Sequence, residues 1–357
     1  LDEAVFVLTK MNRKGIIVLG VIAAVAGLRF LSGCQKPFIT RELTTISLDA
    51  PAHFPPPLDI YRDNPLSKEG IELGRRLFYE PRLSIDNSHP CSSCHEQVAA
   101  FGTFEHDRSH GVFESHTLRN APVLFNLAWY PQFHWDGAIY SLEEQAIQDI
   151  TGPTEMGDNF NNIIRKLEKV PYYRRAFQTV FNTTNIESTQ ILKALAQFTG
   201  SMISANSKYD RVVQGQAVFT AQEASGYQIF QARCNSCHQE PLFTDHSFRN
   251  IGLPVDPSLK DYGRLRVSGR RQDSLKFRVP TLRNVALSSN YMHDGRFMTL
   301  QQCINHYRVG IIPSTTLDPL LQNGIQLTDR QSSDLVAFLR TLTDSSFVRN
   351  PNLAKPE

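Results

Sequence analysis

The chain has 357 residues, of which 41% are hydrophobic, and its 37 basic and 35 acidic side chains leave a net charge of +2. A chain of this length can form two globular domains with separate apolar cores. The balance of charge argues against a nucleic-acid-binding protein, which would need an excess of basic side chains. We therefore expect a globular protein whose function depends on particular motifs.

The N-terminal segment has the features of an export signal. A basic start after Met11 precedes the apolar residues 15–28 and the sequence LSGC, which ends at Cys34. The apolar stretch is too short to predict a membrane-spanning helix. LSGC resembles a bacterial lipobox, so we predict that Cys34 is lipidated. An ordinary signal peptide or an uncleaved anchor is the alternative. Gln35 favours retention at the outer membrane, on the periplasmic side of a Gram-negative bacterium.

The first half of the remaining chain is predicted to be helical. Apolar residues recur at helical spacing in residues 68–78, where Ser67 is a candidate N-cap. The same amphipathic pattern is found in residues 159–170 and 187–203. No stretch alternates apolar and polar residues convincingly, so strands are not expected here.

The second half repeats this helical pattern. Thr220 with Glu223, and Thr328 with Gln331, have the spacing of capping boxes that begin helices. The fold class is therefore predicted to be mainly α. We predict five segments: a leader and lipoprotein signal peptide (1–33), an N-terminal linker (34–64), a first domain (65–207), a second domain (208–345) and a C-terminal tail (346–357).

The motif CxxCH occurs twice, at residues 91–95 and again at 234–238. Two thiols at this spacing can bond to both vinyl groups of one haem, and the next imidazole then ligates the iron. We therefore predict two covalently bound c-type haems. The attachment residues are Cys91, Cys94 and His95 for the first haem, and Cys234, Cys237 and His238 for the second, with His95 and His238 as iron ligands.

Other uses of the six cysteines explain less of the sequence. Besides the lipobox cysteine, only Cys303 lies outside the two motifs. Disulfides within the pairs, or a zinc site of four thiolates, would leave both histidines without a role. A thioredoxin-like redox motif is usually single and lies in a strand-rich context that neither motif shows.

The segments around and between the motifs resemble the bacterial di-haem cytochrome c peroxidase and MauG family over about residues 65–345. They are LGRRLFYEPRLSIDNSHPCSSCH, LRNAPVLFNLAWYPQFHWDGAIYSLEEQA, EM at 155–156, FRVPTLRNVALSSNYMHDGRFMTLQQCINHY and DLVAFLRTLT. Their order in the chain is far more specific than CxxCH alone. The resemblance implies two cytochrome c-like haem domains, a peroxidatic haem domain at 65–207 and a second cytochrome c-like haem domain at 208–345. It also implies an enzyme in which one haem has an open axial position for substrate.

The resemblance implies roles for three residues near the first haem. Trp135 has the position of a tryptophan that carries electrons or a hole between the haems; a core aromatic is the alternative. Gln145 and Glu155 have distal-pocket positions, where a carboxylate can move a proton from the near to the far oxygen of peroxide. For Glu155 the alternative is an exposed acid at a helix entry. The family usually has proline at the position of Asp149.

At the second haem, Tyr307 has the position of the family's methionine ligand, as in the MauG branch. Leu300, Ile304 and Tyr307 share one face of a predicted helix, so core packing is the alternative. His306 is a rival ligand, although on a helix it points about 100° away. A tyrosinate ligand stabilises oxidised iron, so this haem is expected to have a low potential.

Two further assignments follow from the resemblance. His110 corresponds to a histidine that ligates the resting first haem in classical members, with His106 and His116 as competitors and a solvated loop histidine as the alternative. The interdomain calcium ion of the family maps, mostly through backbone oxygens, onto Asn120, Ser288 and Asn290.

These observations predict a di-haem peroxidase that reduces hydrogen peroxide with electrons from a small periplasmic donor, such as a cytochrome c or a cupredoxin. A MauG-like oxidase that modifies a protein partner is the alternative within the family. A non-catalytic di-haem electron-transfer protein is the alternative from another class. A membrane attachment through the lipid anchor and a homodimer are also expected.

Overall fold

The computed structural model describes residues 42–357, and Leu43–Glu357 form one compact unit. Cys34, the predicted leader and the first part of the predicted linker lie outside the described residues. Within residues 42–357, no helix combines the length and the apolar character needed to span a membrane.

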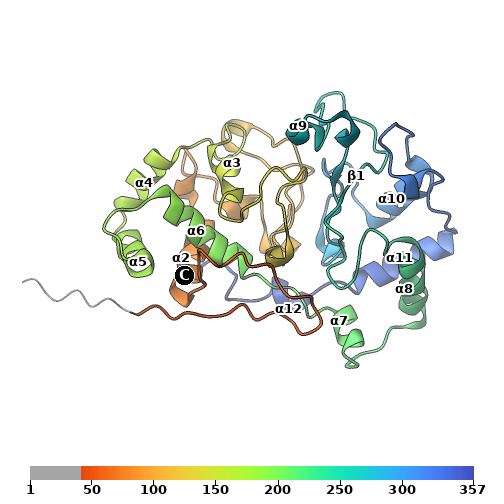
Figure 1. Cartoon of the computed structure of the whole chain (residues 1–357), viewed down its shortest axis with the longest axis horizontal. Coiled ribbons are helices and arrows are strands. Elements are labelled where there is room, and N and C mark those ends of the chain that lie inside the picture. Colours follow the sequence, from red (N-terminus) through yellow and green to blue (C-terminus); the bar gives the residue numbers. More distant parts are fainter. Residues whose placement is uncertain (1–41) are drawn as a thin grey trace, which may run out of the picture. The chain divides into compact units, whose positions relative to one another are not determined.

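Short α-helices joined by long loops build this unit (Figure 1). The α-helices are α2 (Lys68–Phe78), α3 (Gln145–Thr151), α4 (Phe160–Glu168), α5 (Pro171–Phe181), α6 (Ser188–Gly200), α7 (Lys208–Val213), α8 (Ala221–Arg233), α9 (Leu265–Ser268), α10 (Leu300–Asn305), α11 (Asp329–Arg340) and α12 (Ser345–Val348). The strands β1 (Phe248–Arg249) and β2 (Phe277–Arg278) form one antiparallel pair. The mainly α class is confirmed.

The predicted caps begin the helices as expected. The Ser67 side chain accepts a hydrogen bond from the backbone N–H of Gly70 at the start of α2. Thr220 and Thr328 form the capping boxes that begin α8 and α11. These caps are local interactions between residues three apart, which is why the sequence alone predicts them.

One pair of crossing helices organises each half of the unit. Helix α2 packs on α6, and α8 packs on α11, next to which it lies in Figure 1. A glycine allows each close crossing: a Cβ on Gly74 would lie 1.9 Å from the Ala194 carbonyl oxygen, and one on Gly226 would lie 1.9 Å from that of Asp334. In both halves, therefore, the absence of a side chain at one glycine lets the two helices cross closely.

Each helix pair contributes to its own apolar core. The first core includes residues of α2, α4, α5 and α6 and the loop around Phe101 and Phe125. The second includes residues of α8, α10 and α11 around Phe338. Phe347 of α12 packs against Phe101 and Phe125, with ring centroids 5.7 and 5.6 Å apart, so the C-terminal segment contributes to the first core.

Candidate haem sites

The first CxxCH motif forms a tight turn that begins with the 3₁₀ segment Cys91–Ser93. The His95 Nδ1 lies 3.0 Å from the carbonyl oxygen of Phe101, to which it donates a hydrogen bond. Burial lowers the pKa of His95 to about 4, so the imidazole is neutral at pH 7. With Nδ1 protonated, Nε2 has a free lone pair, which is the form that ligates iron.

The second motif begins directly at the C-terminus of α8, where Cys234 is the C-cap. The His238 Nδ1 lies 3.3 Å from the Phe243 carbonyl oxygen and 3.1 Å from that of Pro280. Burial lowers the pKa of His238 as well. Phe101 and Phe243 both have positive φ angles and are fully buried, so both halves orient the histidine by the same device.

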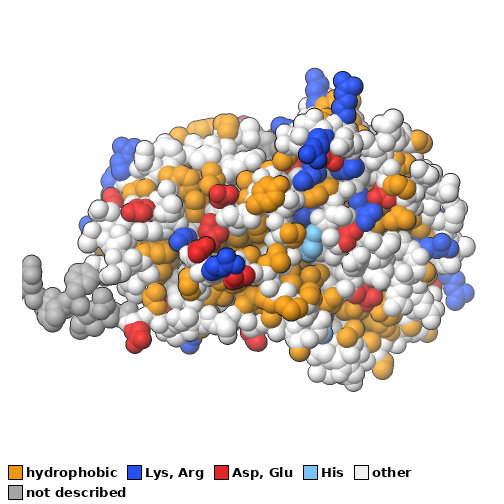
Figure 2. Space-filling model, viewed as in Figure 1, with side chains coloured by type: hydrophobic (Ala, Val, Ile, Leu, Met, Phe, Trp, Pro, Cys, Tyr) orange, Lys and Arg blue, Asp and Glu red, His pale blue; other side chains and the backbone are white. Residues whose placement is uncertain are grey.

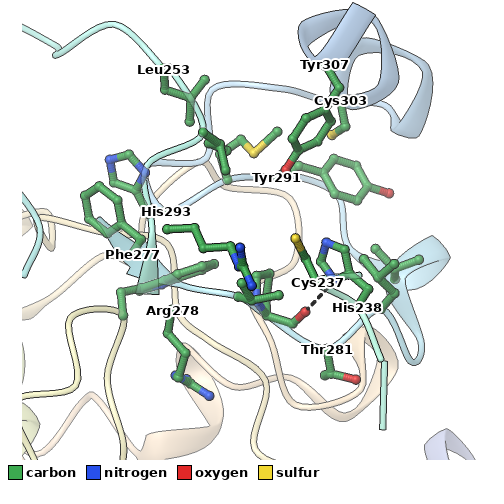
Figure 3. A pocket seen from close by; sticks show the side chains of 18 of the residues that line it. Cys237, His238, Leu253, Phe277, Arg278, Thr281, Tyr291, His293, Cys303 and Tyr307 are labelled. Atoms are coloured by element: carbon green, nitrogen blue, oxygen red, sulfur yellow. Dashed lines mark hydrogen bonds between the residues drawn. The ribbon is translucent and has the colours of Figure 1, made fainter. Parts of the chain in front are cut away.

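A cavity of about 300 Å³ extends from the second motif. Cys237 and His238 lie on one side of it, and the phenol of Tyr307 points into it from the other side (Figure 3). Met292 also lines it. A cavity that brings two thiols and a neutral imidazole together on one wall has the donor set that a c-type haem requires.

Arg278 gives a second test of whether a haem fits. Its Nη1 group is buried without a hydrogen-bond partner, and so are both ring nitrogens of His246. Arg278 lines the same cavity, and its guanidinium lies over the ring of Tyr130 at 4.5 Å. The Arg278 Nε donates to the His134 carbonyl oxygen at 3.2 Å, so only Nη1 is buried without a partner. A buried N–H group of a cation without a partner is costly, and a carboxylate such as a haem propionate would satisfy it.

Carboxyl groups gather near the first motif. The charge of Asp149 raises the pKa of Cys91 and Cys94, after the larger effect of burial, and Glu155 acts in the same way on Cys94. Burial, followed by the charge of Asp149, raises the pKa of Glu155 itself. Gln145 begins α3, and its carbonyl oxygen accepts a hydrogen bond from His134 Nε2 at 3.2 Å. A carboxyl group of raised pKa, Glu155, thus lies near the attachment residues of the first haem, and its part in catalysis stays a prediction.

Trp135 lies where the two halves meet. Its indole N–H donates to the Asn120 carbonyl oxygen at 2.8 Å, and its own carbonyl oxygen accepts from the Arg278 backbone N–H at 2.7 Å. The indole also lines the cavity of the second haem site. These bonds hold Trp135 beside the second site, and its role in carrying electrons between the haems stays a prediction.

Comparison with known proteins decides the family. Residues 68–218 match the model of the di-haem cytochrome c peroxidases, and residues 223–343 match that of cytochrome c. The methylamine utilization protein MauG of Methylorubrum extorquens is 33% identical over 78% of this chain and 79% of its own. The chain belongs to the di-haem cytochrome c peroxidase and MauG family.

Other members of the family agree with this assignment. A cytochrome-c peroxidase of Pseudomonas sp. (strain SCT) is 32% identical over 85% of this chain and 89% of its own. A solved MauG-like protein associated with microbial copper homeostasis is 33% identical, with a TM-score of 0.80 over 87% of this chain and 99% of that one. From its family, we conclude that this chain has two cytochrome c-like domains and binds two c-type haems.

Tyr307, and not His306, faces the second haem cavity of this di-haem protein. The His306 Nε2 is engaged by the Ile251 carbonyl oxygen at 2.9 Å. The expected α-helical face is wrong in one respect: α10 ends at Asn305, and Tyr307 lies in a π-helical turn, His306–Gly310. Such turns are often found at functional sites because they redirect one side chain. Burial raises the pKa of Tyr307, so its deprotonation depends on a cation such as iron.

The structure places His110 beside the first motif without separating it from its competitors. Its carbonyl oxygen accepts a hydrogen bond from Cys94 Sγ at 3.9 Å. Its exposed ring lies 4.4 Å from the rings of both His106 and His116. Ligation of the first haem by His110 stays a prediction.

The three predicted calcium residues all line the second haem cavity. The Asn120 carbonyl oxygen accepts from Trp135, and the Asn290 carbonyl oxygen accepts from the Ser288 hydroxyl at 2.7 Å. Within residues 42–357, no cluster of three or more histidine, cysteine or acidic side chains is arranged to hold a metal ion. Calcium would therefore be bound through backbone and amide oxygens, and this site also stays a prediction.

Sequence reasoning missed the partners of the predicted residues. His134 and Asp149 both act on Glu155, and Arg278 contacts Trp135. Arginine and histidine are common in loops, so their types alone indicate no site. The signal in the sequence that indicated a changed environment of Glu155 was Asp149, which stands where the family usually has proline.

Proposed function

We propose that this protein is a periplasmic di-haem peroxidase that reduces hydrogen peroxide to water with electrons from a small donor, a cytochrome c or a cupredoxin. One observation carries the proposal. Glu155 is an acid of raised pKa beside Cys94, the attachment residue of the first haem. An electron carrier has no use for a proton donor at a haem, whereas peroxide cleavage requires one.

The first haem supplies the iron at which peroxide binds and from which electrons reach the O–O bond. The protein supplies the protons and the orientation. Glu155 can give its proton to the far peroxide oxygen, which then leaves as water, and can take the proton of the near oxygen in return. Gln145, at the start of α3, can hold the peroxide by a hydrogen bond. Trp135 would link this pocket to the second haem, and His238 and Tyr307 are the residues that would hold its iron.

Tyr307 supports the second candidate, a MauG-like oxidase that modifies side chains of a protein partner. An anionic phenolate favours the higher oxidation states of iron, so the second haem could hold an oxidising equivalent in place of accepting electrons. The position of Tyr307 in the cavity is the observation that favours this candidate.

Peroxide added to the fully oxidised protein tests the proposed activity. We expect the haem absorption spectrum to change within seconds and to return when a reduced donor is added. An unchanged spectrum, both before and after reduction of the second haem, would identify a non-catalytic electron-transfer protein. The test needs only the purified holoprotein and a stopped-flow spectrometer.

Substitutions at Tyr307 test the ligand of the second haem. The ferric protein is expected to show a low-spin signal of His–Tyr type by electron paramagnetic resonance, and Tyr307→Phe should abolish it. Tyr307→Met should raise the potential of this haem, because a neutral thioether favours ferrous iron.

His306→Ala is the matched control and should keep the signal. If His306→Ala removes the signal, or if Met292→Leu does so while Tyr307→Phe does not, the assignment of Tyr307 is wrong. The MauG-like candidate then loses its main support.

Attachment to the outer membrane through Cys34 and formation of a homodimer are part of this proposal. The attachment rests on the lipobox-like sequence that ends at Cys34.

A further inference from the structure

The two halves of the protein repeat a short structural unit in the same register. Isolated bridges join Phe133 to Ile139 in the first half and Tyr291 to Phe297 in the second. Each bridge encloses an Asp-Gly turn whose glycine has a positive φ, 69° at Gly137 and 72° in the second half. A short helix follows each turn, α3 in one half and α10 in the other.

This register pairs Asp149 with Tyr307. Each lies thirteen residues after the aspartate of its Asp-Gly turn, which is Asp136 in the first half and Asp294 in the second. In the second half, this position directs the Tyr307 phenol into the haem cavity (Figure 3). By the same register, Asp149 has the corresponding position in the first half, at the end of α3.

The surroundings of Asp149 agree with this placement. Its charge acts on both Cys91 and Cys94, the two attachment residues of the first haem. The register and this charge effect both place Asp149 near the attachment residues of the first haem.

The loop after α3 brings Glu155 onto Asp149. The Met156 N–H donates to the Asp149 carbonyl oxygen at 3.0 Å, and the Asp158 N–H donates to the Ile150 carbonyl oxygen at 3.0 Å. The loop thus folds back along the last turn of α3. These backbone contacts bring the Asp149 and Glu155 carboxyl groups close enough for each to shift the pKa of the other.

We propose that Asp149 and Glu155 form a carboxyl pair that shares one proton on the distal side of the first haem and transfers protons during peroxide cleavage. This proposal rests on the peroxidase function proposed above. Two carboxylates that lie this close together cannot both be charged without a large repulsion, so one of them keeps a proton at neutral pH. Burial raises the pKa of both, which adds to the effect.

A shared proton lets the two groups act at the same time. The ionised carboxylate accepts the proton of the near peroxide oxygen while the protonated carboxyl group gives its proton to the far oxygen. The O–O bond breaks, the far oxygen leaves as water, and the pair ends with one proton as before. The complete reaction takes up two protons from solvent and two electrons from the donor, and gives two water molecules for each peroxide.

The groups that face the pair are compatible with this role. His134 faces Glu155 from the loop before α3, and burial lowers the pKa of His134, so the imidazole is neutral. Cys91 and Cys94 face the pair from the attachment turn and become uncharged thioethers once the haem is bound. None of these groups is a cation that could stabilise two ionised carboxylates, so the pair still needs a shared proton.

The test compares the wild-type holoprotein with Asp149→Asn, which keeps the shape and the ability to form hydrogen bonds but carries neither charge nor an acidic proton. Infrared difference spectroscopy over pH 5–10 follows the protonated carboxyl band. We expect the midpoint of this band to move to lower pH in Asp149→Asn, because Glu155 no longer has an anionic neighbour. The rate with peroxide should fall about 10- to 100-fold.

Glu144→Gln is the matched control, because Glu144 is an exposed carboxylate directly before α3. It should leave both the band and the rate unchanged. An unmoved band in Asp149→Asn would overturn the carboxyl pair. A moved band with an unchanged rate would overturn its part in proton transfer. If the wild-type protein does not react with peroxide, the proposed function fails, and the infrared titration still decides whether the pair exists.

Discussion

Cys91→Ala and Cys234→Ala are each expected to yield a protein with one covalent haem in place of two. A single thioether holds the haem poorly, and the free cysteine of each pair does not replace the lost bond. Intact mass spectrometry of the purified variants, with a haem stain of the denatured chains, measures the number of haems directly. Nearly every variant molecule should carry one covalent haem, because the haem at the intact motif is covalently attached and does not dissociate.

Cys303→Ala is the control for these variants. Cys303 is a free thiol that lines the second haem cavity, but it belongs to neither motif. Its replacement should leave two covalent haems in the protein. Two covalent haems in Cys91→Ala or in Cys234→Ala would show that the two attachment sites are not those assigned.

Glu155→Gln is expected to lower the rate with peroxide by about two to four orders of magnitude while both haems stay in place. The amide has nearly the same shape as the acid but cannot exchange a proton with peroxide. Stopped-flow mixing of the oxidised protein with peroxide gives the rate, and the absorbance of the haems gives their content.

The pH dependence of this rate provides a second criterion. Burial and the neighbouring Asp149 charge raise the pKa of Glu155, so the carboxyl group keeps its proton at neutral pH. The acid form is lost as pH rises through this raised pKa, and the wild-type rate should therefore fall on the alkaline side. In Glu155→Gln the alkaline fall should be absent. An unchanged rate in this variant would assign the acid–base role to another residue.

The positions of local features of the chain could be predicted from the sequence. The capping boxes at Thr220 and Thr328 depend on contacts between residues three apart. The two CxxCH motifs depend on spacing within a single turn. Both kinds of pattern are complete within a few residues, so they do not require knowledge of the fold.

The surroundings of the site residues could not be predicted in this way. The sequence alone would continue α10 through Tyr307, whereas the chain forms a π-helical turn there and His306 bonds to the distant Ile251. Whether His306 or Tyr307 enters the cavity therefore depends on the hydrogen bond between His306 and Ile251, which lie 55 positions apart in sequence.

By itself, the sequence of this protein determined the helix starts and the family and predicted the haem-attachment residues, because each of these is recorded in short, ordered motifs. Only the tertiary structure decided that Asp149 meets Glu155 and that Trp135 is held between Asn120 and Arg278. These contacts arise where loops fold back on helices and where the two halves meet. Such contacts depend on the packing of the whole chain, and no local pattern of residues specifies them.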